Sequence, residues 1–87
     1  MITLELFIAG GAANSARALR NLKAALAAIE ATVDLLVVDV LDEPERAWAD
    51  GIFVTPLLIR RGPPPVQMLL GSMDDAAGIA AFIGATT

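Results

Sequence analysis

Apolar positions alternate at the start of the chain and then change to a helical period. Residues 2–9 place every second side chain on one face of an extended chain, which predicts a strand that ends at Gly10-Gly11. Apolar residues then recur at every third or fourth position up to about Ala31, which predicts a helix with Asn14 or Ser15 as its N-cap. The stripe that we expect to face the core consists of Ala16, Leu19, Leu22, Leu26 and Ile29.

The middle of the chain predicts a second strand and a short helix. Val33–Leu41 is nearly continuous in branched apolar residues, as in a parallel strand that is covered on both faces. A proline and acidic residues follow at positions 42–45, where they suit the first turn of a helix, and Gly51 suits its end. We therefore expect a helix from Pro44 to Asp50. Core packing is the default role of Trp48, and an interface anchor is the alternative.

The last third contains two more apolar runs, Phe53–Ile59 and Val66–Leu70, separated by a proline-rich break. Prolines have no N–H for a central strand, so the pattern predicts a strand, a turn and a strand. Pro56 suits a strand start, an edge or a bulge, and the bond that precedes it is a candidate cis bond. Because proline isomerisation is slow enough to control a conformational change, the candidate conformational residues are Pro56, Pro63, Pro64 and Pro65.

A final helix is predicted over residues 75–83, capped by Ser72 or Asp74. The order is then βαβαββα, in which a βαβ unit continues through a helix into a ββα unit. This is the thioredoxin-like arrangement of an α/β domain with a four-stranded mixed sheet, and we expect one domain over residues 1–87. The first strand should be central, with Leu35–Val40 at one edge and Val66–Leu70 at the other.

The amino-acid composition excludes several kinds of catalytic and binding site. The chain has no Cys, His or Tyr, so thiol–disulfide exchange, thiolate metal sites and imidazole catalysis are excluded. A net charge of −4 without a basic face argues against nucleic acid as the main partner. No apolar stretch approaches the roughly 20 residues of a membrane span, and Glu5 interrupts the apolar start, unlike a signal peptide. We expect a cytoplasmic protein without a cofactor.

Two local patterns have a chemical and a structural interpretation. Gly10-Gly11-Ala12-Ala13-Asn14 occupies the place of Cys-x-x-Cys in thioredoxins, but without cysteine it predicts a plain strand-to-helix turn. Asp39, Asp42, Glu43 and Glu45 could form an acidic metal cluster. Helix capping explains the last three without a metal, and a hydrogen bond to neighbouring backbone is the role that we predict for Asp39.

Over nearly its whole length the chain resembles the KaiB family. The pieces that carry the resemblance occur in order: Ala9-Gly10, Asn14-Ser15, Arg17-Ala18-Leu19, Asp39-Val40-Leu41, Pro44, Thr55-Pro56, and Pro63 through Val66 with Gly71. The resemblance implies a non-enzymatic regulator that binds a KaiC-type hexameric ATPase and helps to sequester a second regulator. Sensor domains of clock-output histidine kinases share the thioredoxin-like form. In some members the second half rebuilds into a different order of helices and strands, which is the alternative fold.

The resemblance also indicates partner-binding residues. Arg17 matches a family position and Arg20 follows it on the predicted helix, although a solvated helix face is the alternative. Leu36 and Val38 lie on the predicted edge strand, which either accepts a strand of a partner or is buried in a homo-oligomer, a dimer or tetramer.

Asp42 and Trp48 complete the predicted partner surface. Clock members of the family tend to carry lysine where this chain has Asp42 and Gly51. The loss of these lysines implies either that the chain does not bind a standard KaiC or that its partner has an altered charge. The alternative function is a redox-inactive thioredoxin-like sensor module or a small-ligand-binding domain.

Overall fold

The computed structural model describes residues 1–29, 32–71 and 73–84. Its elements follow the predicted order: β1 (Ile2–Ile8), α1 (Ala13–Ala27), β2 (Val33–Asp39), α2 (Pro44–Ala49), β3 (Leu57–Gly62), β4 (Gln67–Leu70) and α3 (Ala76–Ile83). The strands form one sheet in the order β2-β1-β3-β4, with β2 parallel to β1 and the other two pairs antiparallel. The thioredoxin-like fold, the central first strand and both predicted edges are thus confirmed.

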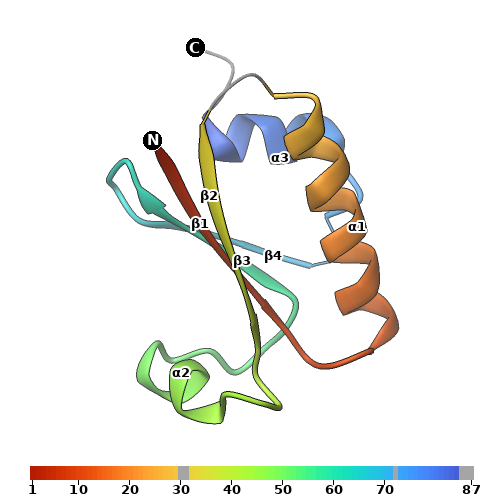
Figure 1. Cartoon of the computed structure of the whole chain (residues 1–87), viewed down its shortest axis with the longest axis vertical. Coiled ribbons are helices and arrows are strands. Elements are labelled where there is room, and N and C mark those ends of the chain that lie inside the picture. Colours follow the sequence, from red (N-terminus) through yellow and green to blue (C-terminus); the bar gives the residue numbers. More distant parts are fainter. Residues whose placement is uncertain (30–31, 72, 85–87) are drawn as a thin grey trace.

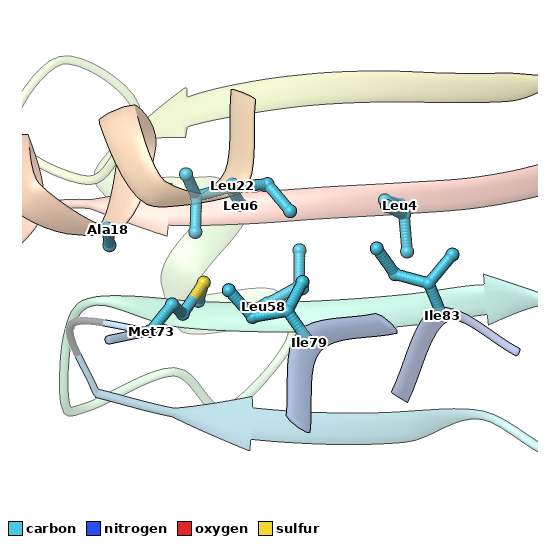
Figure 2. Close-up of a cluster of buried hydrophobic side chains, with 8 residues drawn as sticks. All are labelled: Leu4, Leu6, Ala18, Leu22, Leu58, Met73, Ile79 and Ile83. Carbon is cyan, nitrogen blue, oxygen red and sulfur yellow. The ribbon is translucent and has the colours of Figure 1, made fainter. Parts of the chain in front are cut away.

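The two faces of the sheet are covered unequally. Helices α1 and α3 lie together on one side, to the right in Figure 1, and the short α2 lies at the lower left. The larger core lies between the sheet, α1 and α3, and Figure 2 shows its side chains pointing toward one another: Leu4, Leu6, Ala18, Leu22, Leu58, Met73, Ile79 and Ile83. A smaller core beneath α2 consists of Phe7, Val38, Ala47, Ile52, Leu57 and Ile59.

The start and the buried face of α1 differ from the prediction. The helix begins at Ala13, and no side chain caps it. Ser15 is instead buried within the first turn, where its hydroxyl accepts a hydrogen bond from the Ala9 N–H at 3.0 Å. Ala18 occupies the core position expected of Ala16, because the buried face of the helix runs through Ser15, Ala18 and Leu22, and Ala16 is exposed. The helix ends at Ala27, before Ala31, which lies outside the described residues.

The hairpin also begins later than predicted. Phe53 and Val54 are exposed and precede β3, which starts only after the buried Pro56 and continues to Gly62. Proline has no N–H to pair, so the ladder forms beyond it. The peptide bonds that precede Pro56, Pro63 and Pro65 are cis.

The cap predicted for the last helix is wrong for Asp74. Helix α3 follows Asp75, and no side chain caps it. Asp74 instead accepts hydrogen bonds from Arg17 and Asn21 on α1, at 2.9 Å and 3.0 Å. The Asp74 carboxylate therefore bonds side chains of α1 instead of capping α3, as the local pattern predicts. Ser72, the other cap candidate, lies outside the described residues.

Candidate protein-interaction surface

Exposed apolar side chains run from α2 across the following loop to β4. Trp48 and Phe53 are 79% and 78% exposed, and Val54, Met68 and Leu70 are each more than half exposed. The two aromatic rings meet edge to face, with centroids 6.2 Å apart. Phe53, Val54, Met68 and Leu70 also line one shallow hollow, together with Gly51, Ile52 and Leu57. We call Trp48, Phe53, Val54, Met68 and Leu70 the apolar strip.

The strip exists because α2 is too short to cover its face of the sheet. Opposite residues in the β3–β4 ladder include Leu57 with Leu70 and Ile59 with Met68, so both β4 side chains share a face with the smaller core. Helix α2 has only six residues and buries Ala47 against that core. Core packing of Trp48 is therefore wrong, since the residue is 79% exposed, and the interface anchor stays a prediction.

Paired charges fix α2 and its loop to the sheet beside the strip. The Glu5 carboxylate on β1 accepts from Arg46 on α2 at 2.9 Å and from Arg61 on β3 at 2.8 Å. Arg61 also pairs with Asp50 at 3.0 Å. Burial by itself lowers the pKa of Arg61, but its hydrogen bonds to Glu5 and Asp50 and their negative charges outweigh that effect and raise the pKa above its ordinary value. Two cations and two anions thus form one neutral group.

Asp39 connects the loop after β1 to the end of β2. Its Oδ1 accepts hydrogen bonds from the Gly10 N–H at 3.0 Å and from the Leu41 N–H at 2.9 Å. The predicted bond from Asp39 to neighbouring backbone is confirmed. The two hydrogen bonds of Asp39 join the turn at Gly10, which lies where thioredoxins have Cys-x-x-Cys, to Leu41, which precedes α2.

The acidic residues at the start of α2 do not cap it. Asp42, Glu43 and Glu45 are exposed, and no side chain makes a cap hydrogen bond to this helix. The cap prediction is therefore wrong for Asp42 and Glu43. Their backbone N–H groups donate to the Asp39 carbonyl, which forms a turn between β2 and the helix. Glu45 remains in the first turn, where it complements the helix dipole. Within the described part of the chain, no three acidic side chains are grouped so that they could hold a metal ion.

The predicted edge strand β2 is only partly available to a partner. Leu36 is 46% exposed, whereas Val38 is completely buried in the smaller core. The parallel pairing of β2 with β1 places Val38 opposite Phe7. Its side chain is therefore not available at this surface, and a contribution of Val38 to partner binding through the backbone of the edge strand stays a prediction. The expected cover on both faces is wrong, since β2 is an edge strand and Leu36 and Val37 stay exposed.

The basic candidates lie on another part of the molecule. Arg17 and Arg20 are exposed on α1, which covers the opposite face of the sheet from α2 (Figure 1). Arg17 pairs with Asp74 at 2.9 Å, so part of its charge is already used within the chain. The structure therefore does not bring Arg17 and Arg20 together with Trp48.

Sequence reasoning missed most of the apolar strip. The sequence pattern places Phe53 and Val54 in the first strand of the hairpin, and it places Met68 and Leu70 in the second strand without indicating which face is exposed. The alternation of Met68 and Leu70 places both side chains on one face of β4. This alternation, together with the shortness of the predicted helix at residues 44–50, is the signal in the sequence that indicates an uncovered face.

Comparisons with known proteins agree with this fold. The family model described as KaiB domain matches residues 5–84. The circadian clock oscillator protein KaiB of Nostoc punctiforme is 42% identical over 73 residues, which cover 83% of this chain and 70% of that protein. The protein of the same name from Gloeothece citriformis is 41% identical over 73 residues, 83% of this chain and 69% of that protein.

Two solved structures show the same architecture. The N-terminal domain of Synechococcus elongatus SasA has a TM-score of 0.75 and 31% identity, covering 95% of this chain and 83% of that chain. Chloroplastic thioredoxin z has a TM-score of 0.82 at 18% identity, covering 97% and 76%, which shows the fold alone. Over the described residues, the structure contains no helix with the length and apolar character needed to cross a membrane.

Proposed function

Because the chain belongs to the KaiB family, we propose that it is a non-enzymatic regulator that docks on a KaiC-type ATPase and modulates its activity or its access to other partners. Such a protein would act in the cytoplasm, in a clock or in timer or stress signalling. The observation that carries the proposal is Trp48, a tryptophan that α2 presents to solvent beside Phe53. Exposed aromatic groups of this size are typical of interface anchors.

The docking surface that we propose centres on α2. Trp48 would fill an apolar pocket of the ATPase, and Asp42, exposed just before the helix, would face a basic group at the rim. The ion pairs of Glu5 with Arg46 and Arg61 support this assignment, because they hold α2 in place before a partner arrives. Arg17 and Arg20 would contact only a partner that reaches around to α1.

A second surface is the free edge of β2. Leu36 is partly exposed there, and an edge strand offers unpaired N–H and C=O groups to an added strand. We assign this edge to a second regulator that binds together with the ATPase. The mechanism would be competition for a surface or a shift between ATPase conformations, without chemistry on a substrate.

Size-exclusion chromatography with light scattering tests the proposal. The protein is mixed with the KaiC-type ATPase of its own organism in ATP and in ADP, and co-elution with the hexamer in at least one nucleotide is expected. Trp48→Ala should weaken co-elution about ten-fold or more, as the loss of a buried aromatic anchor does. Lys23→Ala, exposed on α1, is the matched control. Elution of the free protein in both nucleotides would overturn the proposal.

Asp42→Lys tests the charge of the partner. If a basic group faces Asp42, the substitution places like charges together and weakens binding to the ATPase of the same organism. The same variant should bind a clock KaiC more tightly than the natural chain does, because it restores the lysine common in clock members. Unchanged affinity for both ATPases would remove Asp42 from the surface.

A sensor module is the second candidate function. It is favoured by the SasA N-terminal domain, which matches 95% of this chain at 31% identity. Binding to a histidine kinase in place of the ATPase, measured by the same co-elution assay, would support it.

The alternative fold, in which the second half of the chain rebuilds into a different order of helices and strands, also stays a prediction. Its candidate conformational residues are Pro56, Pro63, Pro64 and Pro65. Two exchanging sets of NMR peaks would support it.

A further inference from the structure

The methionines of the chain differ widely in exposure. Met73 is 7% exposed and belongs to the larger core, where Figure 2 shows its side chain, whereas Met68 is 57% exposed. Met1 is exposed too, but it precedes β1 and lies outside the sheet. Met68 lies within β4, opposite Ile59 in the ladder. It is therefore the methionine that the folded sheet presents to solvent.

Oxidants of the peroxide type have few other targets in this protein. They attack sulfur-containing side chains most readily, and the chain has three methionines and no cysteine. No thiolate can therefore intercept the oxidant or form a disulfide. Because side-chain oxidation also depends on exposure, Met68 is the sulfur within a strand or helix that we expect to react first.

The surroundings of Met68 make oxidation consequential. Met68 lines the shallow hollow of the apolar strip, and the other lining residues are uncharged: Gly51, Ile52, Phe53, Val54, Leu57 and Leu70. Oxidation replaces the thioether by a sulfoxide, a polar group that accepts hydrogen bonds. None of these lining side chains has an N–H or O–H to donate. An apolar partner group in the hollow would therefore leave the sulfoxide oxygen without a donor, which is unfavourable.

The same change should leave the fold intact. Strand β4 is held to β3 by main-chain pairing, which the side chain of Met68 does not enter. Met68 belongs to neither hydrophobic core, so its sulfoxide stays in water while no partner is bound. Oxidation of Met73, by contrast, would place a polar group in the larger core and destabilise the protein.

We propose that Met68 is an oxidation site that switches the hollow of the apolar strip from apolar to polar. The terminal oxygen of a hydroperoxide bonds to the Met68 sulfur as the O–O bond breaks, and its proton passes to the departing oxygen. The sulfur loses two electrons, and the peroxide is reduced to an alcohol, or to water in the case of hydrogen peroxide. Reversal requires a methionine sulfoxide reductase and a thiol reductant, since this chain has no thiol of its own.

The switch has a consequence for docking that rests on the proposed function. A polar hollow beside Trp48 would weaken the binding of an apolar surface of the ATPase. The oxidation site and the change of surface are measured with this protein alone. Their tests can therefore fail while the docking test succeeds, and the reverse.

Peptide mass spectrometry after treatment with hydrogen peroxide tests the site. In the folded protein, Met68 should gain an oxygen atom about ten-fold or more faster than Met73. The two rates should converge in urea, where burial no longer protects Met73. Far-UV circular dichroism should be unchanged when Met68 is oxidised and Met73 is not. Equal rates in the folded protein would overturn the inference, as would loss of the fold on oxidation of Met68.

Hydrophobic-interaction chromatography tests the change of surface. The oxidised natural chain should elute earlier than the untreated chain, because a polar group replaces an exposed thioether. Met68→Leu, with an apolar side chain of similar volume and no sulfur, is the matched control. This variant keeps Met1, so its treated form measures the part of the shift that Met1 causes. An equal shift in Met68→Leu would overturn the inference.

Binding to the KaiC-type ATPase measures the functional consequence. Oxidation of the natural chain should weaken co-elution about ten-fold, and a methionine sulfoxide reductase with a dithiol should restore it. Met68→Gln, with a polar side chain of similar length, should bind weakly without peroxide. The affinity of Met68→Leu should be the same before and after treatment. Equal binding of the oxidised and untreated natural chains would overturn the consequence for docking, whereas an untreated chain that does not bind would overturn the proposed function.

Discussion

Arg61 on β3 donates from its Nε to the Glu5 carboxylate on β1 across 2.8 Å. The register between these strands shifts at Thr3 and Leu4, so Arg61 has no residue directly opposite it on β1. Such a bulge bends a strand and redirects a side chain. It thereby allows one guanidinium to reach both Glu5 and Asp50, which joins the sheet to the loop after α2.

Glu5→Gln should destabilise the protein by about 1–3 kcal/mol, because the mostly buried side chain loses its charge while Arg46 and Arg61 keep theirs. Urea unfolding measures the change. Glu45→Gln, which alters an exposed carboxylate on α2, is the matched control and should stay within about 0.5 kcal/mol. Equal effects of the two variants would show that the ion pairs contribute little.

Arg61→Lys should make stability sensitive to alkali. The folded-state pKa of Arg61 is raised, so its contribution is fully present below the ordinary arginine pKa and is lost only as pH rises through the folded value. Lysine has an ordinary pKa of about 10.4, raised further beside two carboxylates, so its contribution is lost at lower pH than that of arginine. The gap in unfolding free energy between the two proteins should stay constant up to about pH 10 and widen above it, as the pH passes through the ordinary lysine pKa and then the raised one. A constant gap would contradict the expected role of these charges.

Asp39→Ala should cost about 1–3 kcal/mol, because the N–H groups of Gly10 and Leu41 lose a shared acceptor. Asp39→Asn keeps an acceptor oxygen and should recover part of the loss. Thermal unfolding measures both variants, with exposed Asp42→Ala as a control that changes stability little. If Asp42→Ala costs as much as Asp39→Ala, the connection is not specific to Asp39.

Ser15→Ala should be destabilising by about 1–3 kcal/mol, because the Ala9 N–H loses its acceptor inside the fold. Asn14→Ala, at the neighbouring exposed position, should change stability by no more than about 0.5 kcal/mol. Chemical unfolding of the two variants separates a buried hydrogen bond from a helix cap. A larger loss for Asn14→Ala would restore the N-cap role that the sequence predicts.

Glycine-to-alanine substitutions should act in opposite directions at Gly78 and Gly51. In α3, alanine at position 78 gains up to about 1 kcal/mol of helix propensity. Its Cβ would meet the Asp75 carboxylate at 2.9 Å, but that exposed side chain makes no cap bond and can turn away. Gly51 has φ +68°, where alanine costs about 1–2 kcal/mol. Melting temperatures test both signs, and destabilisation by Gly78→Ala would mean that Asp75 cannot move.

Local pattern was sufficient for most of the fold. Three local patterns correctly predict elements of the structure: the alternation in residues 2–9, the helical period after Gly11 and the proline break at residues 63–65. The boundaries were less accurate where a local group acts elsewhere. Asp74 bonds Arg17 instead of capping α3, and Ser15 bonds the Ala9 N–H instead of capping α1.

The sequence by itself determined the order of the elements and excluded thiol and imidazole chemistry, because periodicity and residue type are local properties. Only the tertiary structure decided which apolar residues remain exposed. Val38 and Trp48 are both apolar in sequence, but Val38 is opposite Phe7 in the sheet and Trp48 is on the outer side of a helix too short to cover its face. Exposure depends on what packs over a residue, and that neighbour is distant in the chain.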